Sequence, residues 1–206
     1  VKDDGTVEDC TDDGEAGSAL ITASTDTFAT DRRTAEAVND PKYVSPGAGE
    51  KEGLINKFPF YTEKKAYPYW DGQVGEAVEV TYDRTEDLDG LEVYVFRKTV
   101  DRAPIEVSAG IPGYLNQETE LYVEPITGNL INQVDHQERL DEDGNPVIIL
   151  DIAFTEDQLE GSIEESKGNV SSLKLITETV PLIGYVAGIP LLIIGLVMLI
   201  LGLRRG

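Results

Sequence analysis

Residues 179–203, TVPLIGYVAGIPLLIIGLVMLILGL, form an uncharged run between Glu178 and Arg204. At about 1.5 Å per residue, a helix over this run is roughly 37 Å long, which exceeds the bilayer hydrocarbon thickness of about 30 Å. The buried core helix of a soluble protein rarely runs this long without an ionisable side chain. The run therefore predicts a C-terminal transmembrane α-helix. Arg204 and Arg205 follow it, which predicts a cytoplasmic C-terminus and an N-terminal domain outside the plasma membrane.

Four glycines of this predicted helix share one narrow face. At about 100° per residue, their spacing places them within roughly 40° of arc; they are Gly184, Gly188, Gly195 and Gly202. The first two also have the small-xxx-small spacing that lets helix backbones approach closely in lipid. We expect a helix-packing face that contacts integral membrane protein subunits or a second copy of the chain. The alternative is that glycine is simply common in membrane helices.

The net charge of the chain limits the classes of partner that it can bind. Lys and Arg number 17 against 39 Asp and Glu, a net charge of −22 that lies almost entirely before the helix. Such a surface repels phosphate backbones and anionic lipid heads, so we expect no nucleic-acid binding. We divide the chain into a flexible acidic arm (1–17), an extracytoplasmic β-rich domain (18–170), and a juxtamembrane segment with the transmembrane helix (171–206). Export of this domain requires a signal or an N-terminal anchor, which we expect to precede Val1 or to have been removed.

Strand patterns dominate the domain, and they predict a mainly β fold with an antiparallel, curved sheet. Val78, Val80 and Tyr82 alternate with polar residues, and Asp89 with Gly90 suits a tight hairpin turn. The nearly continuous apolar run 147–154 predicts a central strand that is buried on both faces. The predicted strands are an edge strand over 19–28, then 77–82, 91–100, 119–124, 129–140 and 147–154.

Two short helices are also predicted. Residues 31–39 form the first. The second begins at Thr155, whose spacing from Gln158 resembles a capping box. Leu159 and Ile163 share one face of it, and Gly168 with Asn169 offers its end. Residues 171–178 then lead into the membrane as a further helical turn or two.

Residues that usually carry chemistry are scarce. His136 is the single histidine and Cys10 the single cysteine, so neither a nucleophilic triad nor a zinc site is supplied. Asp141 opens a stretch like a calcium loop, but Pro146 and Ile152 stand where Gly and Glu are required. We therefore predict no catalytic residue, no metal and no cofactor, and we do not expect an enzyme.

One soluble segment is unusual, residues 58–71, FPFYTEKKAYPYWD, with six aromatic side chains among polar residues and prolines. Aromatic residues on such a segment serve as binding anchors or membrane-interface contacts. Tyr67, Tyr69 and Trp70 are our candidate partner contacts. The alternative is that the aromatic rings close one end of the sheet as core.

A set of residues and short motifs between residues 30 and 203 forms a recognisable pattern: Arg33, Thr34, Ala35, Tyr43, Val44, Phe58 to Phe60, Glu63, Lys64, Lys65, Tyr67, Pro68, Tyr69, Trp70, Asp71, Gly90, Leu91, Tyr94, Phe96, Pro112, Gly113, Tyr114, Tyr122 to Pro125, Thr127 and Gly128. With this pattern the chain resembles the actinobacterial membrane proteins of uncharacterised function that are labelled porin PorA-like. The resemblance implies a β-rich domain outside the cytoplasmic membrane, anchored at both ends by a helix, and it supplies no catalytic residues. The first of these helices is not in this sequence, so we expect it to lie outside the sequence or to be missing.

The porin label conflicts with two physical requirements. The outward positions of a lipid-facing barrel must be apolar, whereas the predicted strands expose acids: Glu79, Glu92, Glu120 and Glu124. A helical pore needs a polar stripe, which residues 191–203 lack. We therefore predict a non-catalytic, membrane-anchored envelope protein, an accessory subunit of a larger membrane complex such as a respiratory supercomplex. The alternatives are a module whose curved sheet binds a lipid or another apolar ligand, and a component of a porin-like channel.

Overall fold

The computed structural model describes residues 26–108 and 110–203. Four features predicted from the sequence therefore lie wholly or mostly outside the described residues: the acidic arm, Cys10, most of the edge strand over 19–28, and the Arg204–Arg205 pair.

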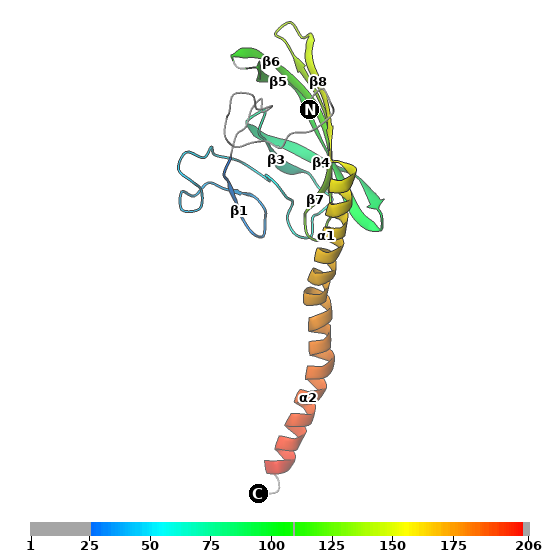
Figure 1. The fold of residues 1–206 in the computed structure, drawn as a ribbon. Coiled ribbons are helices and arrows are strands. Elements are labelled where there is room, and N and C mark those ends of the chain that lie inside the picture. Colours follow the sequence, from blue (N-terminus) through cyan, green and yellow to red (C-terminus); the bar gives the residue numbers. More distant parts are fainter. Residues whose placement is uncertain (1–25, 109, 204–206) are drawn as a thin grey trace, which may run out of the picture.

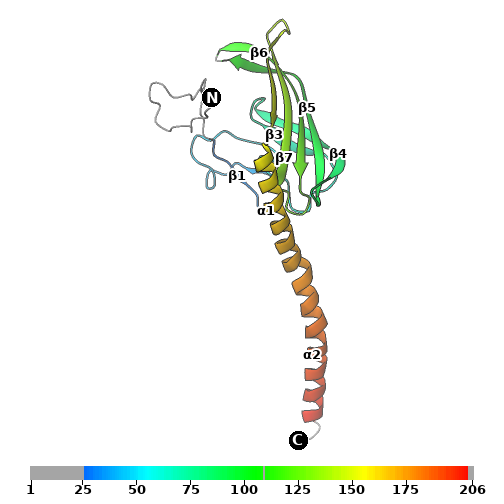
Figure 2. The ribbon, with the colours of Figure 1, turned by 45° about the vertical axis from the view of Figure 1, so that its right-hand side comes forward.

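A six-stranded antiparallel sheet forms the body of the domain, as Figures 1 and 2 show. Its strands follow one another in space in the order of the sequence, so every connection is a hairpin or a short loop. A two-stranded sheet, β1 (Ala29–Thr30) with β2 (Ala37–Val38), lies beside it. The fold is thus mainly β, as predicted. The six strands are β3 (Tyr67–Asp71), β4 (Glu76–Leu88), β5 (Leu91–Ser108), β6 (Ile111–Val123), β7 (Leu130–Leu140) and β8 (Pro146–Ala153).

The predicted β4–β5 hairpin is confirmed. Asp89 and Gly90 have φ values of 51° and 83°, the two positive values that the favoured two-residue hairpin turn requires. Asp87 Oδ1 accepts a hydrogen bond from the backbone N–H of Gly90 at 2.8 Å. The strands are longer than their sequence pattern indicates, because polar residues such as Gln117 and Thr119 occupy buried positions of β6 and interrupt the alternation.

The two faces of the sheet bury separate apolar clusters. On one face, here called the inner face, Phe58 stacks on Phe96 with ring centroids 4.7 Å apart, and Tyr67 meets Phe58 edge-on at 5.4 Å. Neighbouring residues of a strand point to opposite faces, so Val93 lies on the other, outer face. There Ile163 of α1 (Glu156–Lys174) covers it. The helix therefore closes one end of the outer face.

The prediction for β8 is wrong. It is the last strand of the sheet and pairs only with β7, and the side chains of Val147, Ile149 and Ile152 are 57%, 56% and 48% exposed. A continuous apolar run indicates a strand, but in a meander of antiparallel hairpins the last strand lies at the edge. β8 therefore presents an open apolar edge instead of a central core.

The helix predicted over 31–39 is also absent. Asp31 Oδ1 accepts hydrogen bonds from the backbone N–H groups of Arg33 and Thr34 at 2.8 and 2.9 Å, and Ala35 has a φ of 60°. This side-chain capping favours a turn over a helix. The chain then continues into β2.

One long helix leads to the C-terminus. Thr155 caps it as predicted, since its side chain accepts from the N–H of Gln158 at 3.3 Å. The predicted end at Gly168 and Asn169 is wrong, because neither residue takes the left-handed conformation of a helix-ending glycine. The helix passes through a π-helical turn, η1 (Leu175–Thr179), into α2 (Val180–Leu203). It is long and apolar enough to span a membrane.

Candidate functional site

The predicted helix-packing face lies open. A Cβ atom added at any of the four glycines, Gly184, Gly188, Gly195 and Gly202, would meet no heavy atom within 4 Å beyond the adjoining residues and backbone of its own helix. The described side chains of α2 are exposed, with Leu192 at 75%. Tyr185 supplies the one polar side-chain group between Val180 and Leu203. The described part of the chain thus leaves this face uncovered, and its role in packing stays a prediction.

The aromatic segment divides into buried and exposed parts. Tyr67 is only 8% exposed and its hydroxyl accepts a hydrogen bond from the N–H of Glu63, so it is a core residue and offers a partner little surface. Tyr69 packs on the same cluster, and burial raises its pKa to about 12. Trp70 is half-buried, with Lys51 Nζ 5.8 Å from its ring. The exposed rings are those of Phe60 and Tyr61, at 43% and 55%. The alternative interpretation, aromatic rings as core, therefore describes Tyr67.

A polar row crosses the inner face in the middle of the sheet. Lys98 of β5 forms a buried ion pair with Asp71 of β3. The register places Thr119 of β6 beside Lys98, and Asp135 of β7 beside Thr119. Asp135 accepts hydrogen bonds from Thr119 and from the side chains of Gln117 and Gln137. The charged groups of the row are therefore paired and held by four strands, whereas the side-chain carbonyl oxygens of Gln117 and Gln137 have no hydrogen-bond partner among the described residues.

The charge of Asp71 is stabilised by its surroundings. Burial alone would raise the pKa of this carboxyl, but the hydrogen bond and positive charge of Lys98 outweigh it, so the pKa lies below its ordinary value. The backbone N–H groups of Gln73 and Val74 also donate to Asp71. Asp71 therefore stays ionised inside the domain.

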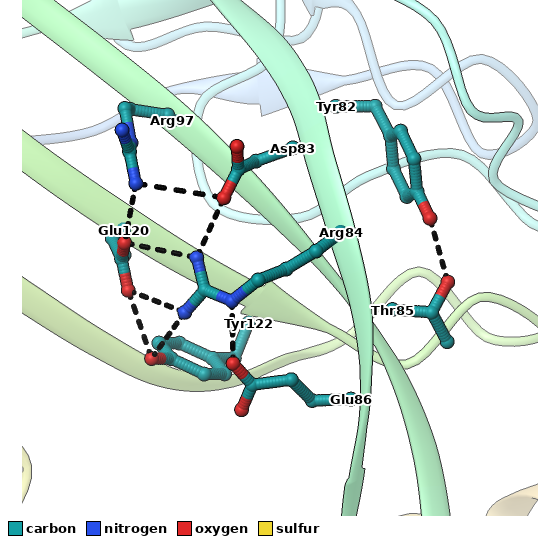
Figure 3. Close-up of polar contacts among 8 residues, drawn as sticks. All are labelled: Tyr82, Asp83, Arg84, Thr85, Glu86, Arg97, Glu120 and Tyr122. Carbon is teal, nitrogen blue, oxygen red and sulfur yellow. Dashed lines mark hydrogen bonds and ion pairs between the residues drawn. The ribbon is translucent and has the colours of Figure 1, made fainter.

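An ion-pair network covers the outer face of the three central strands (Figure 3). Arg84 of β4 reaches both carboxylate oxygens of Glu120 on β6, at 3.0 and 2.8 Å, and its Nε donates to Glu86. Arg97 of β5 also donates to Glu120, at 3.0 Å, and the Tyr122 hydroxyl donates to it at 2.9 Å. The Arg84 hydrogen bonds are the largest cause of the lowered pKa of Glu120, about 2. Each charge in this network thus has a partner.

Two acids differ from the sequence prediction that they are exposed. Glu120 is held in the network just described. Glu124 is 2% exposed and accepts hydrogen bonds from the backbone N–H groups of Ile126 and Thr127. Its carboxylate orders the turn over 125–128, because a buried acid needs such donors. Glu79 and Glu92 are exposed as predicted.

The structure brings no catalytic set together among its described residues. His136 is exposed, and its Nδ1 lies 2.7 Å from Asp151 Oδ1; this hydrogen bond is the first cause of its raised pKa. Asp141 accepts hydrogen bonds from the backbone and the side chain of Asn145, so its carboxylate serves its own turn. Within residues 26–108 and 110–203, no three His, Cys, Asp or Glu side chains form a group that could hold a metal.

Comparison with known proteins identifies the family. The model of the Porin PorA family matches residues 2–197. The chain belongs to this porin family. Two relatives are proteins named Porin PorA. The one from Corynebacterium amycolatum is 32% identical over 101 residues, which cover 43% of this chain and 26% of the relative. The one from Corynebacterium resistens is 28% identical over 116 residues, 50% of this chain and 28% of the relative.

Family membership changes the order of the functional hypotheses. The chain matches about a quarter of the length of these relatives. Their names support a membrane protein of the cell envelope, and they favour the porin-like alternative over the accessory-subunit hypothesis. A respiratory supercomplex has no support. Porins are not enzymes, so at family level the matches also support a non-enzyme.

Proposed function

We propose that this protein is a membrane-anchored component of a porin-like channel, in which α2 crosses the plasma membrane and the β domain lies outside. The match to a porin family over residues 2–197 carries the proposal. The one helix of the described residues that is long and apolar enough to cross a bilayer supplies the anchor.

The channel wall needs several polypeptides. One helix cannot enclose a pore, and α2 has a single polar side chain, that of Tyr185, with which to line one. The sheet is open, and the exposed acids Glu79 and Glu92 make its surface unsuitable for lipid. Several membrane helices must therefore surround the water path. They come from further copies of this chain or from other membrane proteins.

The glycine face of α2 is the proposed contact between these helices. Without side chains, Gly184 and Gly188 let a neighbouring backbone approach closely, and lipid provides no hydrophobic force that could replace such packing.

The lipid-carrier alternative gains no support from the inner face. Phe58 and Phe96 stack there, and the Lys98–Asp71 ion pair lies in the middle of the sheet. The chain's own side chains thus fill this face of the sheet, where an apolar ligand would otherwise find room.

Conductance decides the proposal. The full chain is purified in mild detergent, its assembly state is measured by native mass spectrometry, and the assembled species is added to a planar bilayer. We expect discrete current steps from the assembled species. If the assembled species produces no current across the bilayer, the proposed channel function is wrong and the accessory-subunit hypothesis replaces it.

A further inference from the structure

A hollow opens at the end of the β domain that lies toward the membrane helix. It is formed by the turn between β1 and β2 and by the loop before residue 61. Its volume is about 540 Å³. The lining residues are Thr30, Asp31, Arg32, Arg33, Lys57 and Phe60.

This hollow is cationic although the chain carries a net charge of −22. Three of its six lining residues are basic, and Arg32, Arg33 and Lys57 form no ion pair with any other described residue. The one acid in the lining, Asp31, accepts hydrogen bonds from the backbone of its own turn. On its other side, Lys57 borders a second hollow that includes Glu165 of α1. Three cationic side chains therefore line the hollow, and the single acid beside them, Asp31, is already hydrogen-bonded to its own turn.

Partial burial of Lys57 favours a bound anion at the hollow. Desolvation lowers the pKa of Lys57, and its Nζ lies 4.1 Å from the centroid of the Phe60 ring. A cation held against an aromatic face and partly removed from water is stabilised by a nearby negative charge. Phosphate oxygens match such a set, because guanidinium groups donate to them in pairs and an ammonium adds a point charge.

The hollow lies close to the expected membrane surface. The Tyr61 hydroxyl donates a hydrogen bond to Thr177 Oγ1 at 3.4 Å, and Thr177 lies three residues, about 4.5 Å of helix rise, before Val180 at the start of α2. Trp and Tyr rings are enriched at this level of a membrane protein, and Tyr61 is exposed here together with its neighbour Phe60. The loop that carries Lys57 is thus tied to the helix just above the apolar span.

We propose that this hollow binds the phosphate group of an anionic phospholipid in the outer leaflet, with Arg32, Arg33 and Lys57 as donors. Phe60 and Tyr61 lie among the neighbouring headgroups. The lipid clamps the β domain against the membrane and fixes its orientation above α2. The acidity of the chain opposes this contact only weakly at physiological salt, because interactions between exposed charges more than about 8 Å apart are largely screened. The net charge of −22, which argued against contact with anionic lipid heads, does not describe this local surface. The site is independent of channel activity.

Lipid selectivity measured on the full chain tests the proposal. The protein is reconstituted in nanodiscs of equal phosphatidylglycerol and phosphatidylcholine, released, and analysed by native mass spectrometry for the lipid that stays bound. We expect phosphatidylglycerol to be retained preferentially. In the double variant Arg32→Gln/Lys57→Gln, each lost cation lowers this preference about five-fold. The matched control is Lys42→Gln/Arg102→Gln, which removes the same charge from exposed residues outside the hollow.

The outcomes separate cleanly. Retained preference in the control and its loss in the hollow variant, at an unchanged unfolding temperature, support the site. Two results overturn it: equal retention of the two lipids by the unaltered chain, or equal losses in both variants. None of these results depends on whether the protein conducts ions.

Discussion

Arg84 of β4 donates hydrogen bonds to both carboxylate oxygens of Glu120 on β6, although β5 lies between the two strands. Arg97, on β5 itself, donates to the same carboxylate. One acid therefore ties three strands on the outer face of the sheet. Because the strands are already paired by backbone hydrogen bonds, this network adds to their stability and does not create the sheet.

Replacing Glu120 with Gln should weaken the sheet modestly. The amide keeps an acceptor for Arg84 but loses the charge, and a partly exposed ion pair of this kind contributes about 1 kcal/mol. We expect a lower unfolding temperature in detergent with an unchanged circular-dichroism spectrum. Glu92→Gln, an exposed acid on β5, is the control and should have no effect. Equal behaviour of the two variants would show that the network contributes nothing.

Acid should abolish the difference between the unaltered chain and Glu120→Gln. The pKa of Glu120 is lowered from 4.5 to about 2 in the folded state, so its ionised form stabilises the fold above about pH 4.5. This contribution is lost as the pH falls from about 4.5 to about 2. Unfolding temperatures of the two proteins should therefore converge over this window. Subtracting one from the other removes the effect of every other acid, and a difference that stays constant would contradict the assignment.

The Lys98–Asp71 pair should be much more sensitive, because it is buried. Lys98→Met leaves the Asp71 carboxylate inside the domain with only the backbone donors of Gln73 and Val74. Breaking a buried ion pair on one side costs roughly 3 to 5 kcal/mol. Thermal unfolding should show this loss.

Two further variants test the cause of that loss. Adding Asp71→Asn to Lys98→Met should restore much of the stability, because the amide is neutral and still accepts from the backbone. Lys65→Met removes one partner of an exposed pair with Glu63 and should change little. If the double variant is as unstable as Lys98→Met, lost packing of the lysine stem is the cause, not the uncompensated charge.

Local features of the fold could be predicted from the sequence. Asp89 and Gly90 indicate their hairpin because few residues tolerate positive φ, and Thr155 indicates a helix start because its side chain caps a nearby N–H. The position of β8 could not be predicted. Its apolar run is equally compatible with the centre and the edge of a sheet, and strand order is a long-range property.

The polar features of the candidate sites depend on register. Lys98 and Asp71 are 27 positions apart, and Arg84 and Glu120 are 36 apart, so no local pattern joins them. The cationic hollow escapes detection for the same reason, since Arg32 and Lys57 meet only after folding. The net charge of the whole chain, which includes 39 acidic residues, also gives no sign of these basic residues. The glycine face can be predicted from the sequence, because the regular geometry of a helix places residues with this spacing on one side.

The glycine face of α2 should decide assembly without affecting insertion. Gly188→Leu/Gly195→Leu places bulky side chains where a neighbouring backbone is expected, while the helix stays apolar and inserts normally. No described residue packs within 4 Å of these positions, so the β domain should be unaffected. The variant should reach the membrane at its normal level but migrate on a native gel without its companions. Ile193→Leu/Val197→Leu changes the same helix off the glycine face and should assemble normally. If both variants keep the same companions, the glycines are incidental, and contacts of the outer domain must hold the assembly together.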